Sequence, residues 1–421
     1  MGFFDIDRWT EIWATITRNK TRSLLTCLGV FWGILMLVLL LGSGTGMKNG
    51  IWGMLDGFAT NSIIIMTDRT GEPYKGFNKG RSWNMRNRDL QSIEDNVQGT
   101  DAVSAMIFGD RTEKNIVYGQ LSGTYSIKGV FPANFRIETP ILRYGRLINE
   151  IDTGEKRKVC VIGRDVNKTL FGDEDPCGKY IRVNGIYYQI VGSVDAKSNS
   201  VNINGRTAES VFLPFTTMQQ TLNQGDILHL LLISGQRGYP IQHIIDDVTD
   251  ILKTQNEIAP NDPQAIRVMN LAAQFATFEM LFIGIDFLIW LVGMGSLLAG
   301  IIGISNIMMV TVRERTREIG VRRALGAKPF NIISQVMSES LVLTALAGLT
   351  GLTLGVFILD LVNRMLAAQP PSDNTIFLNP QVSIQTALAA TAVLLISGLV
   401  AGLIPAWRAM KIKAIDAIRE E

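Results

Sequence analysis

The run LLTCLGVFWGILMLVLLL, residues Leu24–Leu41, contains no charged side chain over a length close to the ~20 residues that a helix needs to cross a bilayer. Three later runs have the same apolar character. They are Phe278–Val312 with its unbroken part Phe287–Val312, then Val336–Val362 and Ala387–Ile404. The sequence therefore predicts four transmembrane helices, with most of the remaining chain lying between the first and the second.

The composition agrees with a membrane protein that carries a large polar insertion. Of the 421 residues, 47% are hydrophobic and 19% are charged, below the roughly 25% charged content of soluble domains. A formal net charge of +2 excludes a polybasic nucleic-acid binder. Two histidines and three cysteines exclude a zinc site of ordinary spacing and a disulfide-rich scaffold, so we expect no metal ligands.

A cleaved signal peptide is the alternative interpretation of the first apolar run. The segment ahead of the run carries Asp5, Asp7 and Glu11, and no cleavage site of small residues follows it. We therefore expect the first run to remain as a membrane-spanning helix.

Lys and Arg are concentrated in three segments beside these runs. They are the segment before the first run (Arg8, Arg18, Lys20, Arg22), residues 313–335, and the segment after the fourth run (Arg408, Lys411, Lys413, Arg419). The connection Asn363–Thr386 holds only Arg364. Because short basic segments stay in the cytoplasm, both termini and residues 313–335 are predicted to be cytoplasmic. Gly42–Thr277 then faces outside.

Gly42–Thr277 has the patterning of a folded α+β domain. Strands are predicted at Asn61–Met66, Lys158–Ile162, Tyr180–Val183, Tyr187–Val191, Val211–Pro214 and Leu228–Ile233. Helices are predicted at Arg88–Gln98 and Tyr239–Asn256, a hairpin turn at Asn184-Gly185, and a mobile loop at Gly71–Arg88. We expect two subdomains, with the middle portion Phe108–Phe215 inserted into the outer one.

Cysteine and nucleotide motifs add two further expectations. Cys160 and Cys177 lie in the outside domain, where a disulfide is chemically allowed; a bridge and two unpaired cysteines both remain open. The glycine-rich segment that starts at Gly42 is not a phosphate-binding loop, because Met47 and Asn49 occupy positions that need Gly and Ser or Thr. We therefore expect no catalytic residue and no ATP hydrolysis by this chain itself.

The basic segment 313–335 is predicted to contain a short helix at Glu314–Leu325. Ile319, Arg322, Arg323 and Gly326 would then share one helix face. Such a helix could lie in a groove of a partner protein or form a solvated loop that only sets the topology. Ahead of the first span, Phe3–Ile16 is predicted to be an amphipathic helix in the membrane interface, either bracing an ATPase or serving only as an anchor.

Acidic residues close to the membrane are costly, so a specific role is predicted for each of them. We place Glu279 in a stalk outside the hydrocarbon and expect Asp286 to make an interfacial or interhelical contact. Glu339 is predicted to order the junction between the basic loop and the third span. Asp360 and Arg364, four residues apart, are predicted to form a surface pair.

The most specific stretch is GIIGISNIMMVTVRERTREIGVRRALGAKPFNIISQVMSESLVL, residues Gly300–Leu343. It closely resembles the signature of the MacB/FtsX-type ABC transporter permeases. Further blocks agree at Arg18–Thr26, at Leu170-Phe171-Gly172 with Ile190-Val191-Gly192, and at Pro405–Ala409. Three departures are Phe58-Ala59 where Gly is usual, Cys177 where an aliphatic residue is usual, and a chain that begins without the ATPase domain fused in MacB.

The resemblance implies an α-helical membrane protein with four transmembrane helices and a large α+β periplasmic domain inserted between helices 1 and 2. The implied segments are a cytoplasmic amphipathic helix (1–23), transmembrane helix 1 (24–41), a MacB-like periplasmic core domain (42–277), a stalk with transmembrane helix 2 (278–312), a cytoplasmic coupling loop (313–335), transmembrane helix 3 (336–362), a short periplasmic loop (363–386), transmembrane helix 4 (387–404) and a cytoplasmic C-terminal helix (405–421).

The same resemblance assigns ATPase coupling to the loop. The implied coupling residues are Arg313, Glu314, Arg315, Arg317, Glu318, Gly320, Arg322, Arg323 and Gly326, with Arg317, Glu318, Arg322 and Arg323 as the expected contacts. The implied partners are a separate ATPase dimer that binds ATP and Mg²⁺, a second permease subunit (identical or related), a periplasmic adaptor and an outer-membrane channel. No cofactor is expected in this chain.

The implied function is that of an inner-membrane permease that transmits ATP-driven motion to its periplasmic domain and exports substrate from the periplasm. Two alternatives stay open. One is FtsX-like mechanotransmission that regulates envelope enzymes, for which the outside domain is larger than expected. The other is extraction of lipoproteins, for which the sequence offers no identifiable lipid cavity.

Overall fold

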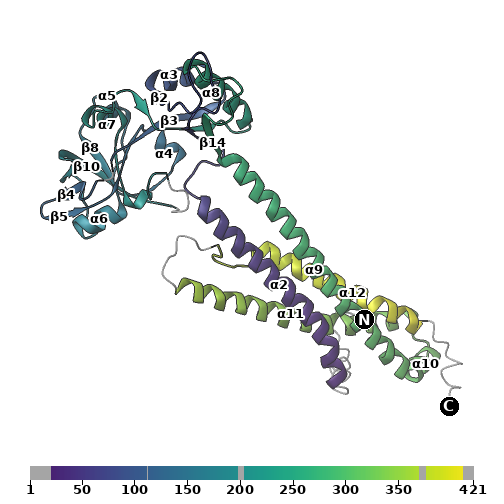
Figure 1. Ribbon diagram of the computed structural model, residues 1–421. Helices are drawn as coiled ribbons and strands as arrows, with labels where there is room; N and C mark the ends of the chain where they lie inside the picture. Colours follow the sequence, from purple (N-terminus) through teal and green to yellow (C-terminus); the bar gives the residue numbers. More distant parts are fainter. Residues whose placement is uncertain (1–19, 111, 198–202, 369–375, 411–421) are drawn as a thin grey trace. The chain divides into compact units, whose positions relative to one another are not determined.

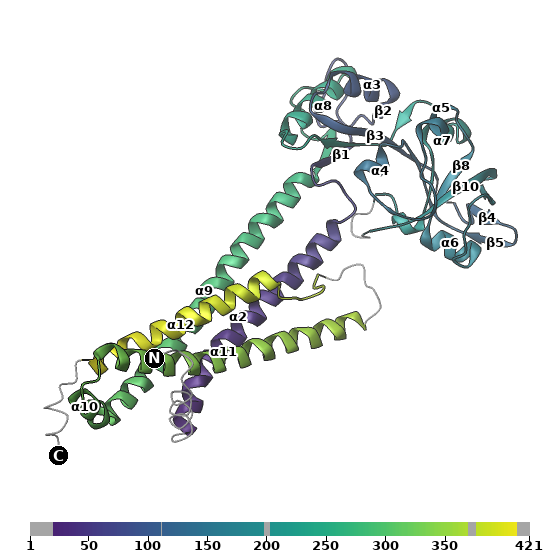
Figure 2. The ribbon, with the colours of Figure 1, turned by 180° about the vertical axis from the view of Figure 1, so that it is seen from behind.

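The computed structural model describes residues 20–110, 112–197, 203–368 and 376–410, and Figures 1 and 2 show the chain from opposite sides. It divides into two compact units. A helical unit comprises Met1–Ile51 with Leu281–Glu421, and a strand-rich unit comprises Trp52–Met280. The helix predicted at Phe3–Ile16 and the C-terminal segment 411–421 lie outside the described residues.

Four helices in the described residues are long and apolar enough to cross a membrane, which confirms the four predicted spans. They are α2 (Lys20–Leu55), α9 (Leu271–Glu314), α11 (Pro329–Ala367) and α12 (Ile384–Met410), and a short helix α10 (Thr316–Ala324) separates α9 from α11. The helices are longer than the apolar runs. In particular, α2 continues past Leu41 to Leu55, and α9 begins at Leu271, before Phe278.

The fourth predicted span and the start of the predicted C-terminal helix form one continuous helix in the structure. Helix α12 continues through Pro405 to Met410, and the side chains of Ala401, Pro405 and Ala409 are all buried on one face. Proline removes one backbone hydrogen bond, but neighbouring helices often compensate for this loss in membrane proteins. The spacing of four residues between these buried positions therefore extends the apolar face beyond the proline.

Small residues allow the long helices of the helical unit to approach one another closely. A Cβ atom added at Gly300 of α9 would lie 3.0 Å from the backbone nitrogen of Val30 in α2. A Cβ atom added at Gly351 of α11 would lie 2.7 Å from the carbonyl oxygen of Phe31, also in α2. These glycines therefore pack helices within one chain, where a larger side chain would push the backbones apart.

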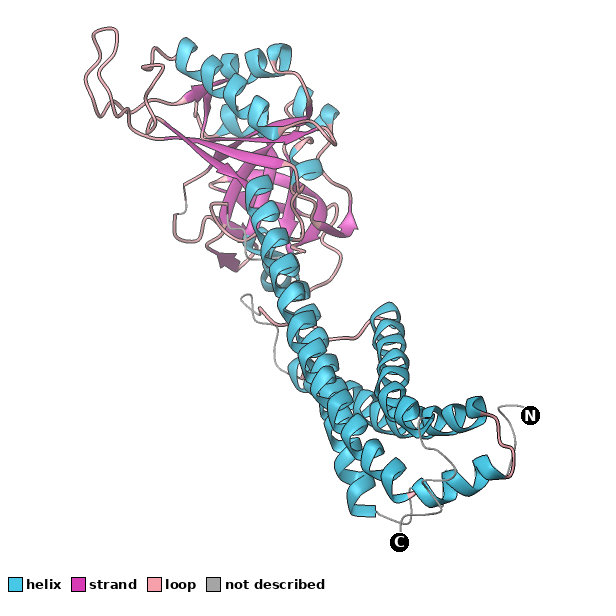
Figure 3. Cartoon of the chain, turned by 90° about the vertical axis from the view of Figure 1, so that its right-hand side faces the viewer, coloured by secondary structure: helices cyan, strands magenta, loops and turns pink. Residues whose placement is uncertain are grey.

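In the described residues, the strand-rich unit contains a mixed sheet of twelve strands, drawn in magenta in Figure 3, and a separate sheet of two strands. Its strands are β1 (Ser62–Thr67), β2 (Met85–Arg86), β3 (Thr100–Phe108), β4 (Ile116–Tyr118), β5 (Leu121–Gly123), β6 (Ser126–Val130), β7 (Ile141–Gly145), β8 (Val159–Gly163), β9 (Tyr180–Val183), β10 (Ile186–Asp195), β11 (Ser210–Pro214), β12 (Ile227–Leu228), β13 (Leu230–Gly235) and β14 (Ile266–Asn270). Its helices are α3 (Asn87–Asn96), α4 (Asn134–Ile137), α5 (Glu150–Gly154), α6 (Arg164–Phe171), α7 (Phe215–Thr221) and α8 (Ile241–Gln255), with a 3₁₀ turn at Thr207–Glu209.

The sheet follows the order β14-β1-β13-β3-β6-β11-β8-β10-β9-β4-β5, and β7 pairs with β10. The middle portion Phe108–Phe215 supplies the strands from β4 to β11. Antiparallel pairing of β3 with β6 joins them to the outer strands, so the inserted portion continues the same sheet. The hairpin turn between β9 and β10 is confirmed, since both Asn184 (φ 45°) and Gly185 (φ 89°) have positive φ.

Three local predictions change in the structure. The strand predicted at Leu228–Ile233 is two strands, because the chain switches partner at His229 from β2 to β3. The segment Gly71–Arg88 is predicted to be a mobile loop. In the structure it contains a hairpin with a two-residue turn between Tyr74 and Phe77, then strand β2 and the start of α3. Cys160 and Cys177 are both free, so the bridged alternative is wrong.

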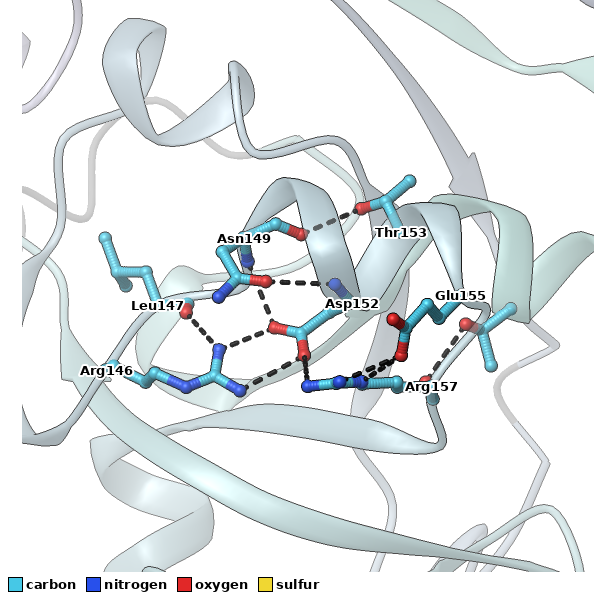
Figure 4. A network of polar contacts seen from close by, with 8 residues as sticks. Arg146, Leu147, Asn149, Asp152, Thr153, Glu155 and Arg157 are labelled. Carbon is cyan, nitrogen blue, oxygen red and sulfur yellow. Dashed lines mark hydrogen bonds and ion pairs between the residues drawn. The ribbon is translucent and has the colours of Figure 1, made fainter.

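One buried carboxylate organises the segment between β7 and β8 (Figure 4). The side chain of Asp152 is fully buried and accepts two hydrogen bonds from Arg146, from Nη1 at 2.5 Å and from Nη2 at 3.1 Å. It also forms an ion pair with Arg157, whose Nη1 lies 3.8 Å from Asp152 Oδ1. Asn149 and Asp152 also cap α5 reciprocally, each side chain accepting the other's backbone N–H. Burial opposes the charged form, but these hydrogen bonds and the two arginine charges outweigh it and lower the pKa of Asp152.

Candidate functional site

Helix α10, between α9 and α11, occupies the position predicted at Glu314–Leu325. Ile319 and Gly320 form its buried inner side. The helix ends at Ala324, and just beyond it Gly326 has φ 93°, a left-handed conformation that is common where helices end. The segment is therefore a separate short helix with one face turned toward its own chain.

An ion pair connects the entry of α10 to α11. Arg315 Nη1 lies 3.0 Å from Glu339 Oε1, and the Glu339 side chain is only 6% exposed. Because a buried carboxylate without a partner is costly, this pair fixes where Arg315 and Glu339 meet. The structure thus places Glu339 at the junction of loop and long helix, with Arg315 as its partner.

Two further arginines of α10 also bind within the chain. Arg322 donates hydrogen bonds to Glu318 Oε1 at 2.8 Å and to Gln335 Oε1 of α11 at 2.9 Å. Arg323 donates to the backbone carbonyl oxygen of Met410, at the end of α12, at 2.8 Å. The predicted contact of Arg322 and Arg323 with a partner protein stays a prediction; within the chain their guanidinium groups connect α10 to α11 and α12.

A small cavity of about 30 Å³ lies behind α10. It is lined by both polar and apolar side chains, among them Thr311, Ile319, Gln335 and Glu339. This volume suffices for a single water molecule with several polar neighbours, and it is too small for a nucleotide or an organic ligand. The inner side of α10 is therefore a packed junction.

The outer side of α10 combines charge with exposed apolar side chains. Arg317, Val321 and Leu325 follow one another at four-residue spacing and are all exposed, Leu325 by 83%. Phe330, in the first turn of α11, is 75% exposed. We call Arg317, Val321, Leu325 and Phe330 the outer surface of the loop. Val321, Leu325 and Phe330 were not among the predicted coupling residues. Apolar side chains within a basic loop were nevertheless a signal in the sequence for a contact surface.

The remaining predicted coupling residues lie at the surface of the helical unit. Arg313, Glu314 and Glu318 are exposed, and Gly326 is exposed beyond the end of α10. Among the described residues, no group of three or more His, Cys, Asp or Glu side chains could hold a metal ion.

The predicted polar residues of the long helices separate into three cases. Asp286 makes the expected interhelical contact, since its Oδ2 lies 2.5 Å from Lys48 Nζ of α2, and Lys48 Nζ also lies 5.7 Å from the centre of the Phe282 ring. Glu279 is exposed on α9. Asp360 and Arg364 form the predicted exposed pair at 2.8 Å.

Comparison with known proteins identifies two matching regions. Residues 23–251 match the family described as MacB-like periplasmic core domain, and residues 290–414 match the one described as FtsX-like permease C-terminal. Two relatives named macrolide export ATP-binding/permease protein MacB, from Bdellovibrio bacteriovorus and Wolinella succinogenes, are 27% identical over 410 and 415 residues. Each alignment covers 97% of this chain and 60% of the relative, so the chain spans less than two thirds of their length.

One solved structure is also similar in part. It is the periplasmic region of MacB from Actinobacillus actinomycetemcomitans, with a TM-score of 0.43 and 18% sequence identity. The similarity covers 53% of this chain and 95% of that one.

Proposed function

The chain belongs to the MacB/FtsX-type family of ABC transporter permeases, and from this premise we propose that it transmits ATP-driven motion across the inner membrane to export substrate. It is a multi-pass membrane protein with four apolar helices and a strand-rich domain between the first two. The proposed substrate is one already on the periplasmic side. Relatives named for macrolide export favour efflux of hydrophobic compounds.

The observation that carries this proposal is the construction of α10. Its inner side is joined to α11 and α12 by Arg315, Arg322 and Arg323, whereas its outer surface exposes apolar side chains. A force applied to the outer surface would therefore reach two long helices at once. In our proposal a cytoplasmic ATPase dimer, which holds ATP and Mg²⁺, binds this surface, and both chain termini lie on the same side.

Continuous helices supply the next step of the proposal. Helix α2 extends to Leu55 and α9 begins at Leu271, so each passes without a break from the membrane-spanning run into the strand-rich unit. A tilt of either helix would move its far end, as with a lever. Substrate would then be expelled through a periplasmic adaptor and an outer-membrane channel by a permease dimer, without crossing the membrane between the helices.

Mechanotransmission without transport is the second candidate, favoured by the FtsX-like match over residues 290–414. It uses the same coupling helix and the same continuous helices. The two candidates differ only in what the strand-rich unit acts on, so substrate export by the reconstituted system distinguishes them.

The first test replaces exposed apolar residues of the outer surface. The variants Leu325→Asp and Phe330→Asp are each expected to weaken ATPase binding by about 30-fold, as for a central interface residue worth about 2 kcal/mol. Co-purification of the ATPase and stimulation of its ATP hydrolysis measure the effect. Leu121→Asp in β5 is the control, because Leu121 is 50% exposed and lies in the strand-rich unit. Normal ATPase binding by both loop variants would contradict the proposed docking surface.

A second test concerns the contact between the two continuous helices. Asp286→Lys places two positive charges where Lys48 and Asp286 now pair, so the helices should separate at this point. Because both side chains are partly exposed, we expect a loss of about 1 kcal/mol, or roughly fivefold in transport rate. The exchanged pair Lys48→Asp with Asp286→Lys should recover most of the activity. Equal activity of the single variant and the wild type would remove this contact from the transmission path.

A further inference from the structure

Residues 70–81 of the strand-rich unit form a closed hairpin between β1 and β2, which we call the hairpin arm. At its base the Thr70 N–H donates to the Arg81 carbonyl oxygen at 3.1 Å, and the Gly80 N–H donates to the Thr70 carbonyl oxygen at 2.7 Å. At its tip Tyr74 and Phe77 exchange backbone hydrogen bonds of 3.1 and 2.9 Å. The arm is therefore closed at both ends by its own backbone.

A buried carboxylate fixes the base of the arm to the domain. Asp262 is 2% exposed, and its Oδ2 accepts the backbone N–H groups of Gly71 at 2.7 Å and Glu72 at 3.2 Å. Its Oδ1 accepts those of Gln264 and Ala265. Burial opposes the charged form, but four backbone hydrogen bonds outweigh it and lower the pKa of Asp262. The carboxylate thus stays charged and holds the arm at neutral pH.

Arg81 connects the hairpin arm to the end of α8 and to the Phe77 ring. Its Nη2 donates to the carbonyl oxygens of Asn256 at 2.6 Å and Glu257 at 3.0 Å, just past the end of α8. The same guanidinium lies 4.1 Å from the centre of the Phe77 ring, a favourable cation–π distance. Phe77 is therefore held in position although its side chain is 41% exposed.

The tip has a backbone conformation that most residues avoid. Lys75 has φ 44° and Gly76 has φ 88°, the signs required by the tight hairpin turn that matches strand twist. For a residue with a side chain, such as Lys75, this left-handed conformation is unfavourable. The tip is thus built as one defined shape, which favours recognition of a partner.

The surface of this tip is basic and aromatic. Lys75, Phe77 and Lys79 are all exposed, and Glu72 is the one acidic residue within the arm. In the described part of the chain, Lys75 and Lys79 form no ion pair with an acidic residue. The charges of Lys75 and Lys79 are therefore available to an external anion. In the sequence the two lysines lie on either side of Phe77.

We propose that the hairpin arm binds an acidic segment of a protein partner in the compartment of the strand-rich unit. The two lysines would pair with carboxylates while the Phe77 ring packs against an apolar side chain between them. A lipid surface fits less well, because recognition of anionic lipids takes a cluster of about 4–8 Lys or Arg, and the tip carries only Lys75 and Lys79. This inference is independent of the proposed transport function and adds a second contact surface.

The test measures binding of a fluorescent twelve-residue peptide of alternating Glu and Leu to the full chain in nanodiscs of neutral lipid. The double variant Lys75→Glu with Lys79→Glu is expected to bind about tenfold more weakly, and Phe77→Ala several-fold more weakly. The matched control is Lys156→Glu with Lys158→Glu, which changes the net charge equally at another exposed site. Equal weakening by arm and control variants would overturn the proposal.

A second pair of variants separates shape from charge. Gly76→Val strains the tip without changing charge and should weaken peptide binding about fivefold, because β-branched residues disfavour positive φ. Gly238→Val is the control, since Gly238 has a similar φ of 84° and likewise has open space around it. Unchanged binding by Gly76→Val would overturn the role of the tip geometry.

A competition experiment distinguishes a protein partner from a simple anion. If inorganic polyphosphate of equal charge displaces the labelled peptide at the same concentration as unlabelled peptide does, the arm is a general anion site and the proposal of a protein partner is overturned.

Discussion

Replacing Glu339 by glutamine is expected to reduce ATP-driven transport at least tenfold while the protein still inserts into the membrane. Glutamine keeps the shape of the side chain but removes the carboxylate charge that pairs with Arg315. Removing one charge of a buried ion pair typically costs about 3–5 kcal/mol, and the cost is smaller here because the Arg315 side chain is 25% exposed. Helix α10 should then lose this connection to α11 and keep the hydrogen bond from Arg322 to Gln335. Transport and ATP hydrolysis by the reconstituted permease and ATPase measure the effect.

Two further variants make this expectation specific. Asp360→Asn breaks the exposed pair with Arg364, where at most about 1 kcal/mol is at stake, so its transport should stay near that of the wild type. The double variant Arg315→Met with Glu339→Leu removes both charges and should recover part of the loss. Wild-type transport by Glu339→Gln would show that the ion pair has no part in coupling.

Replacing Asp152 by asparagine is expected to destabilise the strand-rich unit by about 2 kcal/mol at neutral pH. Asp152 is fully buried, and the variant would weaken its hydrogen bonds with the guanidinium of Arg146, which is itself 44% exposed. A hydrogen bond to a charged group contributes about 1.5–3 kcal/mol. Glu155→Gln is the control, because Glu155 is 61% exposed although it pairs with Arg157 at 2.8 Å. Urea unfolding of the full chain in detergent, followed by tryptophan fluorescence, measures the difference.

The Asp152 network also predicts how stability depends on pH. The pKa of Asp152 is lowered in the folded protein, whereas an unfolded aspartate titrates near pH ~4. The stabilisation is therefore fully present above that pH and is lost as the pH falls through the lower folded pKa. Wild type and Asp152→Asn should differ at pH 7 and converge in acid. A constant difference from pH 7 to pH 2 would contradict this role of the carboxylate.

Most elements of the fold could be predicted from local patterns. The four apolar runs predicted the four long helices, and short apolar runs with turn residues around them predicted β1, β8, β9, β10 and β11. The turn at Asn184-Gly185 was also predictable, because few residue types accept positive φ at two successive positions. Helix ends were less predictable: α12 passes through Pro405 because buried side chains on both sides of it continue the same face.

The candidate site was only partly predictable. Its position between α9 and α11 and its helical form followed from the sequence, and so did the expectation that Glu339 orders the junction. The roles of individual arginines did not follow, because a guanidinium on a helix can turn toward solvent or toward the chain with equal helical spacing. The structure directs Arg322 to Gln335 and Arg323 to Met410, and it leaves Leu325 exposed.

By itself the sequence determined the number of spans, the α+β character of the inserted domain and the family. These properties depend on hydrophobicity and periodicity, which act over a few neighbouring residues. Only the tertiary structure decided which charges are buried. Lys128, for example, lies in an ordinary strand pattern, yet it is 1% exposed and donates to the Gly205 carbonyl oxygen at 2.8 Å. The partners of Lys128, Asp262 and Glu339 lie far from them in the chain or on another helix, and folding alone brings them within hydrogen-bond distance.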